Sequence, residues 1–165
     1  MARGDVERTV QQSILDRLID LEPHERADPP STWAQSVREL KRSVHRDVES
    51  LLNTRRTPEP APEGMTELHR SVFDYGLPDI SSMSRDSPQT RTRLLRLVEE
   101  AITLFEPRLT NVRASFIESD EPNRRELHFM IEALLRMDPN PEPVVFDTTL
   151  DVSSGRYQLQ GGSGA

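Results

Sequence analysis

The sequence predicts an α+β fold in which N-terminal helices pack on a mainly antiparallel sheet of about four strands in the C-terminal half. Two observations carry this prediction. Apolar residues recur at helical spacing in the first two thirds of the chain, as they do in amphipathic helices. Beyond Pro107 the apolar residues alternate with polar ones, which is typical of strands that bury one face.

The first two predicted helices lie before residue 54. Residues 6–21 carry an apolar stripe at helical spacing, with Asp5 as the predicted N-cap and a proline just beyond as the stop signal. The second helix is predicted to begin at residue 31 or 32, because Thr32 and Gln35 form a capping-box pattern. Its apolar stripe predicts an end near Asn53.

A loop, a short helix and a long helix are predicted next. Residues 57–64 hold three prolines and no periodicity, so they are expected to form a loop. Residues 68–75 allow a short helix that a glycine closes. The clearest helix of the chain starts at Ser87, the predicted N-cap, and Pro88, and it runs to Phe105. Since this helix is apolar on most sides, we expect it at the centre of the fold.

The C-terminal third predicts four strands. They are residues 112–116, 127–133, 144–152 and 156–159. Turn-forming residues separate them at 120–123, 139–143 and 153–155. In the first two strands every second residue is apolar, so one face of the sheet is expected to face the helices.

Length and composition indicate one domain with extensions. We assign residues 1–30 to an N-terminal helix and linker, 31–160 to the domain, and the glycine-rich 161–165 to a flexible tail. The absence of cysteine excludes disulfides and thiolate metal sites. The N-terminus lacks a signal-peptide pattern and no apolar run reaches membrane-spanning length, which predicts a cytoplasmic protein without direct membrane insertion.

Charge is unevenly distributed along the chain. The net charge is −7, which disfavours nucleic acid as a partner, because such binding depends on neutralising phosphates. Residues 36–56, however, hold six basic and three acidic side chains. This local positive charge is expected either to form a partner surface or to be a solvated helix face.

The residue types needed for catalysis do not assemble in a recognisable pattern. The four histidines, His24, His45, His69 and His128, form no zinc-binding pair, so no metal is predicted. The sequence has no phosphate-binding glycine loop and no nucleophile elbow. A glycosidase needs a carboxyl group with a raised pKa, whereas a neighbouring arginine lowers the pKa of a carboxyl group. We therefore predict no enzymatic activity and no cofactor.

The motif that stands out is Glu106-Pro107-Arg108-Leu109, at the junction of the long helix and the first strand. Pro107 has no N–H and forces the helix to end. It also favours an extended Glu106, so that the side chains of Glu106 and Arg108 project to the same side. The charged pair is predicted either to bind a partner protein or to form an ordinary surface ion pair at a helix stop.

Three blocks together resemble a known family. They are Ser36-Val37-Arg38-Glu39-Leu40 continuing through Leu51-Leu52-Asn53-Thr54-Arg55-Arg56, then Ser71-Val72-Phe73-Asp74-Tyr75-Gly76-Leu77-Pro78-Asp79, and Ala101-Ile102 followed by Glu106-Pro107-Arg108-Leu109. In order and spacing they resemble the TssE branch of the contractile-tail baseplate wedge proteins, a family long labelled "lysozyme-like". The resemblance covers roughly residues 36 to 160.

The resemblance implies a structural baseplate subunit of a type VI secretion system, located at the cytoplasmic side of the inner membrane complex. Its implied partners are the baseplate subunits TssF, TssG and TssK and the sheath subunits TssB and TssC. An exposed sheet edge is expected to accept strands from another chain and so to template the sheath. Glu106, Pro107 and Arg108 inherit an interaction role by similarity.

Arg55 and Arg56 end the first block and are also predicted to bind protein. The alternative is that they are solvated cations placed favourably at a helix C-terminus. Two other functions remain open at the sequence level. One is a peptidoglycan hydrolase, as the family label suggests, and the other is a wedge protein of a contractile phage tail or another injection system.

Overall fold

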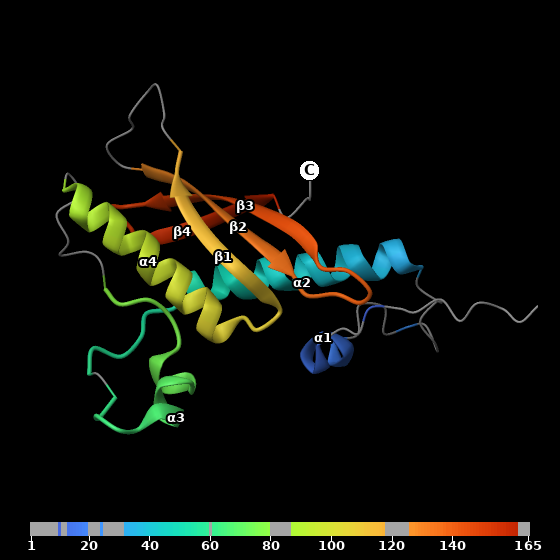
Figure 1. Ribbon diagram of the computed structural model, residues 1–165, viewed down its shortest axis with the longest axis horizontal. Helices are drawn as coiled ribbons and strands as arrows, with labels where there is room; N and C mark the ends of the chain where they lie inside the picture. Colours follow the sequence, from blue (N-terminus) through green and yellow to red (C-terminus); the bar gives the residue numbers. More distant parts are fainter. Residues whose placement is uncertain are drawn as a thin grey trace, which may run out of the picture.

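The computed structural model describes residues 10, 13–19, 24, 32–59, 61–79, 87–117 and 126–161. It confirms the α+β class, with helices in the N-terminal half and one four-stranded antiparallel sheet in the C-terminal half (Figure 1). The elements in chain order are α1 (Ile14–Leu18), α2 (Trp33–Asn53), α3 (Thr66–His69), the 3₁₀ helix η1 (Val72–Asp74), α4 (Pro88–Phe105), β1 (Leu109–Phe116), β2 (Glu126–Leu135), β3 (Glu142–Asp151) and β4 (Arg156–Gly161).

The sheet is a meander with strand order β1-β2-β3-β4, so β1 and β4 are its edges. Each predicted strand is present. Strands β1, β2 and β4 extend beyond their predicted bounds, whereas β3 begins two residues before its predicted start and ends one residue before its predicted end. The largest extension is in β1, which begins at Leu109 because a bulge between Thr110 and Arg113, with Asn111 at φ 54°, restores the alternation. The predicted turn at 120–123 lies outside the described residues.

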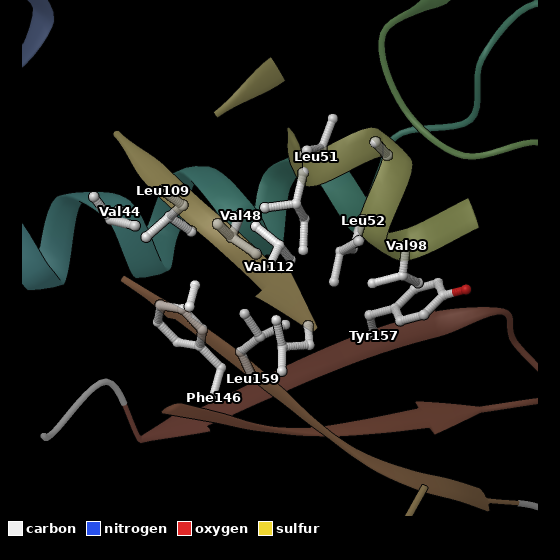
Figure 2. Packing of buried hydrophobic residues seen from close by; sticks show 14 of the residues in the cluster. Val44, Val48, Leu51, Leu52, Val98, Leu109, Val112, Phe146, Tyr157 and Leu159 are labelled. Atoms are coloured by element: carbon white, nitrogen blue, oxygen red, sulfur yellow. The ribbon is translucent and has the colours of Figure 1, made fainter. Parts of the chain in front are cut away.

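The core lies between the sheet and the two long helices (Figure 2). Every second residue of the strands faces α2 and α4, as the alternation predicts. The largest fully buried side chains are Phe129, Phe146, Leu51, Leu52, Ile102, Ile131, Leu135, Leu150, Val44, Val48, Val98 and Val144. Full burial of each such aliphatic side chain contributes about 1.5–3 kcal/mol, so this layer is the main source of stability.

Helix α2 matches its predicted bounds closely. The Thr32 hydroxyl accepts a hydrogen bond from the Gln35 N–H, and the Gln35 side chain accepts one from the Thr32 N–H. This capping box satisfies two of the N–H groups that a helix start leaves without intrahelical partners. Helix α4 likewise starts at Pro88, although the Ser87 side chain bonds the Gln89 side chain rather than capping the backbone.

The first helix differs from the prediction of a helix over residues 6–21. Helix α1 spans only Ile14–Leu18, and its N-cap is Ser13, whose hydroxyl accepts from the Asp16 N–H. Val10 is not helical, and the predicted cap Asp5 lies outside the described residues. The periodicity failed here because α1 has no apolar surface to pack against. Ile14 and Leu18 are each 76% exposed.

The short helix predicted at 68–75 is two separate turns, α3 and η1. Ser71 divides them, because its hydroxyl donates to the Leu68 carbonyl and accepts from the Phe73 N–H. Gly76 follows at φ 105°, and a Cβ at this position would lie 2.3 Å from the Thr54 carbonyl oxygen. The segment therefore returns to the end of α2 at a point where only glycine fits.

The remaining differences are small. The predicted connector at 139–143 ends earlier than expected, because β3 begins at Glu142 and pairs Pro143 with Leu134. Gly161, assigned to the tail, is the last residue of β4. Among the described residues, no helix is both long and apolar enough to cross a bilayer.

Candidate functional site

The Glu106-Pro107-Arg108 element lies where α4 ends and β1 begins. Pro107 cannot continue the helix, so Glu106 is its C-cap, with φ −119° and ψ 79°. The Leu109 N–H donates to the Glu106 carbonyl over 3.0 Å and closes a tight turn. The strand therefore starts immediately after the motif, and this geometry fixes the backbone on both sides of it.

Glu106 points inward and is 4% exposed. Its Oε1 accepts hydrogen bonds from the Arg108 backbone N–H at 3.2 Å and from Nε at 2.7 Å. Its Oε2 accepts from Nη2 of the same arginine. A bidentate, charge-assisted pair of this kind is among the stronger polar contacts in proteins, and here it holds a carboxylate that the core would otherwise exclude.

Arg108 also reaches across to helix α2. Its Nη2 donates to Asp47 Oδ2 at 2.6 Å and its Nη1 donates to the Ser43 hydroxyl at 3.1 Å. The hydrogen bonds to Glu106 have the largest effect on the pKa of Arg108, and they raise it. Burial acts in the opposite direction, but the hydrogen bond to Asp47 adds to the increase, so the pKa is raised. One side chain thereby joins the α4–β1 junction to α2.

The network continues from α2 to α1. Arg46 pairs with Asp47 at 2.9 Å and with Asp16 at 2.8 Å. Ser43 donates its hydroxyl hydrogen to Asp16 Oδ2 at 2.6 Å. Burial by itself would raise the pKa of Asp16, but hydrogen bonds from Ser13, Ser43 and Arg46 lower it to about 2. Asp16 is therefore the anchor by which the short helix α1 docks on the body. We call the set Asp16, Ser43, Arg46, Asp47, Glu106 and Arg108 the polar network.

The sequence motif is thus part of a larger arrangement. Glu106 and Arg108 do form the predicted pair, but Glu106 is buried and its carboxylate is occupied within the chain. Pro107 is exposed beside them. Sequence reasoning missed the network's α2 members. Their signal was the spacing of Ser43 and Asp47, four residues apart on one helix face.

Arg55 and Arg56 lie just beyond the C-terminal end of α2 and do not join the polar network. Arg55 forms a parallel bridge with Leu77, and the Arg56 N–H donates to the Leu77 carbonyl over 3.0 Å. Their backbones are therefore fixed while their side chains are exposed. The Arg55 guanidinium is 65% exposed and lies 4.0 Å from Asp79. Both side chains are thus held at the surface by a fixed backbone.

The chemistry available at the motif is that of a structural ion pair. Glu106 would have to leave Arg108 before it could serve as a general acid or base. Within the described ranges, His, Asp and Glu residues form no group of three or more that could hold a metal ion. The second carboxylate nearby, Asp47, is bound to the same guanidinium.

Two comparisons with known proteins bear on this site. A family model described as baseplate wedge protein gp25 matches residues 38–140, which include α2 from its second turn, the Glu106-Pro107-Arg108 element, β1 and β2. The matched range contains every member of the polar network except Asp16. A comparison with curated proteins found no match.

Proposed function

We propose that this chain is the small wedge subunit of a type VI secretion baseplate. The premise is that the chain belongs to the baseplate wedge protein gp25 family, which includes the TssE subunits. A structural role in the baseplate of a contractile injection system follows from the family itself. The finer proposal is that the chain binds TssF, TssG and TssK and templates the sheath subunits TssB and TssC. It would do so at the cytoplasmic side of the inner membrane complex.

The observation that carries the templating role is an antiparallel sheet with two edges that lie in different environments. An edge strand offers unpaired N–H and C=O groups to which another chain's strand can add. Helix α2 occupies one edge. Asn53 donates to the Tyr157 carbonyl and accepts from the Tyr157 N–H, both at 2.9 Å, and His45 Nε2 lies 3.2 Å from the Leu159 carbonyl. The β4 edge is thus already engaged by side chains.

The β1 edge is less engaged. Among the described residues, the helix side chain that hydrogen-bonds the outward-facing backbone of β1 is that of Glu99. Its carboxylate accepts from the Ala114 N–H at 2.7 Å. We therefore assign strand addition to β1, where a partner strand displaces a single carboxylate. The bulge near Asn111 confines the regular part of this edge to residues 113–116.

The proposal includes the absence of catalysis. The carboxylate that a hydrolase would use is buried and paired with Arg108. Peptidoglycan turnover that Glu106→Gln abolishes would overturn this part of the proposal.

The experiment is co-purification of the chain with co-expressed TssF, TssG, TssB and TssC. The exposed pair Arg55→Ala with Arg56→Ala should deplete TssF or TssG, and Arg93→Ala with Arg96→Ala on the exposed face of α4 is the charge-matched control. Ala114→Pro removes the outward N–H of β1 and should deplete the sheath subunits while leaving the melting temperature within a few degrees. Recovery of none of these partners with the wild-type chain would overturn the type VI assignment.

A further inference from the structure

A depression lies at the C-terminal end of α2, and Arg46 of the polar network lies at one side of it. There the end of the helix meets the segment 77–79 and the β3–β4 turn at 152–155. The deeper part is a cavity of about 70 Å³, and a shallow groove adjoins it. Asn53, Arg55, Ser154 and Gly155 line both parts, so the two are continuous. We call the whole the α2-end groove.

Tyr157 belongs both to the lining of the cavity and to the core. Its hydroxyl is buried, with no hydrogen-bond partner among the residues that the structure describes, so the groove does not reach it. The ring is fixed by edge-on packing against Phe129, with centroids 6.3 Å apart, and its oxygen lies at the outer end of the core beyond Leu52 and Val98 (Figure 2). The side chain therefore gives the cavity a rigid wall.

The groove is also locally positive. Arg46, Arg55 and Arg156 line the depression, against two carboxylates, Glu49 and Asp79. Arg46 is bound to Asp16 and Asp47 in the polar network. The Arg156 guanidinium has no hydrogen bond or ion pair within the described part of the chain, and Arg55 is held only by the 4.0 Å contact with Asp79. Two cations are therefore available to a ligand on a chain whose net charge is −7.

Size and chemistry together select the ligand. A cavity of about 70 Å³ holds a group of a few heavy atoms, since a water molecule takes about 30 Å³ of liquid volume. A carboxylate fits this space and pairs with a guanidinium in bidentate fashion. Asp79 at the rim would be displaced from Arg55 as the ligand enters.

We propose that the α2-end groove binds an acidic segment of a partner protein, whose carboxylates pair with Arg55 and Arg156. The open shelf accommodates the extended backbone of such a segment beside Ser50, Asn53 and Ser154. A nucleic acid fits less well, because two available cations on an acidic chain neutralise few phosphates.

The test measures binding of a short fluorescent peptide of aspartate and glutamate to the full chain by fluorescence anisotropy. A lysine peptide and a single-stranded oligonucleotide are the comparison probes. Arg55→Ala with Arg156→Ala should weaken binding of the acidic peptide at least about tenfold, whereas the charge-matched Arg93→Ala with Arg96→Ala should leave it unchanged. An equal loss of peptide affinity in the two double variants would overturn the site, since binding would then depend on net charge alone. Tighter binding of the oligonucleotide than of the peptide would also overturn it.

Two further variants separate the ligand contacts from folding. Tyr157→Phe should leave the affinity for the peptide unchanged and keep or raise the melting temperature, because it removes a buried unsatisfied hydroxyl that the groove does not reach. Asp79→Asn should strengthen binding of the peptide more than the charge-matched Glu100→Gln on α4, because Asp79 competes for Arg55. If Asp79→Asn does not change the affinity, the groove does not take a carboxylate at Arg55 and the proposal fails.

This inference extends the proposed protein-binding role of Arg55, but its test needs no baseplate subunit. Failure of the peptide to bind while TssF and TssG still co-purify would remove the groove and leave the proposed function standing. Peptide binding without co-purification would retain the groove and remove the type VI assignment.

Discussion

At the scale of single residues, Arg108 is the side chain on which the polar network depends. It donates from Nε and Nη2 to Glu106, from Nη1 to Ser43, and from Nη2 also to Asp47. Replacing a whole buried ion pair with apolar residues is often neutral, whereas removing one partner leaves an uncompensated buried charge. The two partners of this pair are therefore expected to respond very differently to single and to double substitution.

Arg108→Ala should destabilise the fold by about 3 kcal/mol, because Glu106 would remain buried without its cation. If the pair were instead exposed and bound a partner, the hypothesis that the sequence left open, this variant would leave folding largely intact and weaken the partner contact. Urea unfolding of the isolated chain measures the difference, with the exposed Arg96→Ala as control. An unchanged midpoint for Arg108→Ala would show that the pair is loose in solution and would favour the original hypothesis.

At the scale of elements, α2 organises the molecule. Its middle carries Ser43, Arg46 and Asp47, which bind α1 and the α4–β1 junction. Near its start, Lys41 pairs with Glu142 of β3 at 2.6 Å. Its last residue, Asn53, pairs with both backbone groups of Tyr157. The helix therefore stiffens the sheet from β3 to the β4 edge.

Asn53→Ala should cost about 1–2 kcal/mol, because it removes two hydrogen bonds to an edge strand. The effect of this variant on local opening around Tyr157 should exceed its effect on global unfolding. Hydrogen exchange at the Tyr157 amide should accelerate strongly, since that N–H loses its acceptor. Gln158→Ala on the exposed face of the same strand is the matched control, and equal exchange at Tyr157 in both variants would contradict the role of Asn53.

At the scale of the whole molecule, helix α1 and the body are joined largely by charge. Helix α1 buries none of its own residues and exposes Ile14, Leu15 and Leu18. Its attachment consists of Asp16 bound to Ser43 and Arg46. Because so little apolar surface is involved, this attachment should weaken with acid and with salt while the core remains intact.

The acid dependence has a definite sign. The pKa of Asp16 is lowered to about 2 in the folded chain, against a usual 3.8, so its contribution to stability is fully present above pH 3.8 and is lost as the pH falls through about 2. Thermal unfolding of wild type and Asp16→Asn across this range should show a constant difference above about pH 4 that shrinks toward pH 2. A difference that stays constant throughout would contradict the anchoring role. Glu100→Gln supplies the control.

The sequence by itself determined the elements whose signals are local. The capping box at Thr32 set the start of α2 and Pro88 set the start of α4. Alternation of apolar residues identified β1 and β2, and turn-forming segments set off β3 and β4. These signals work because hydrogen bonds within a helix and side-chain alternation along a strand depend on near neighbours in the chain. The family match to residues 38–140 agrees with the resemblance carried by the same segments.

Only the tertiary structure decided what the charged residues do. Arg108 meets Asp47, which lies 61 residues away, and Asn53 meets Tyr157 across 104 residues. Periodicity could not place Glu106 inside the core, nor bring Arg55, Arg156 and Tyr157 to one groove. Long-range partners are chosen by how helices pack on the sheet, and that packing depends on the whole apolar layer rather than on the few residues around each charge.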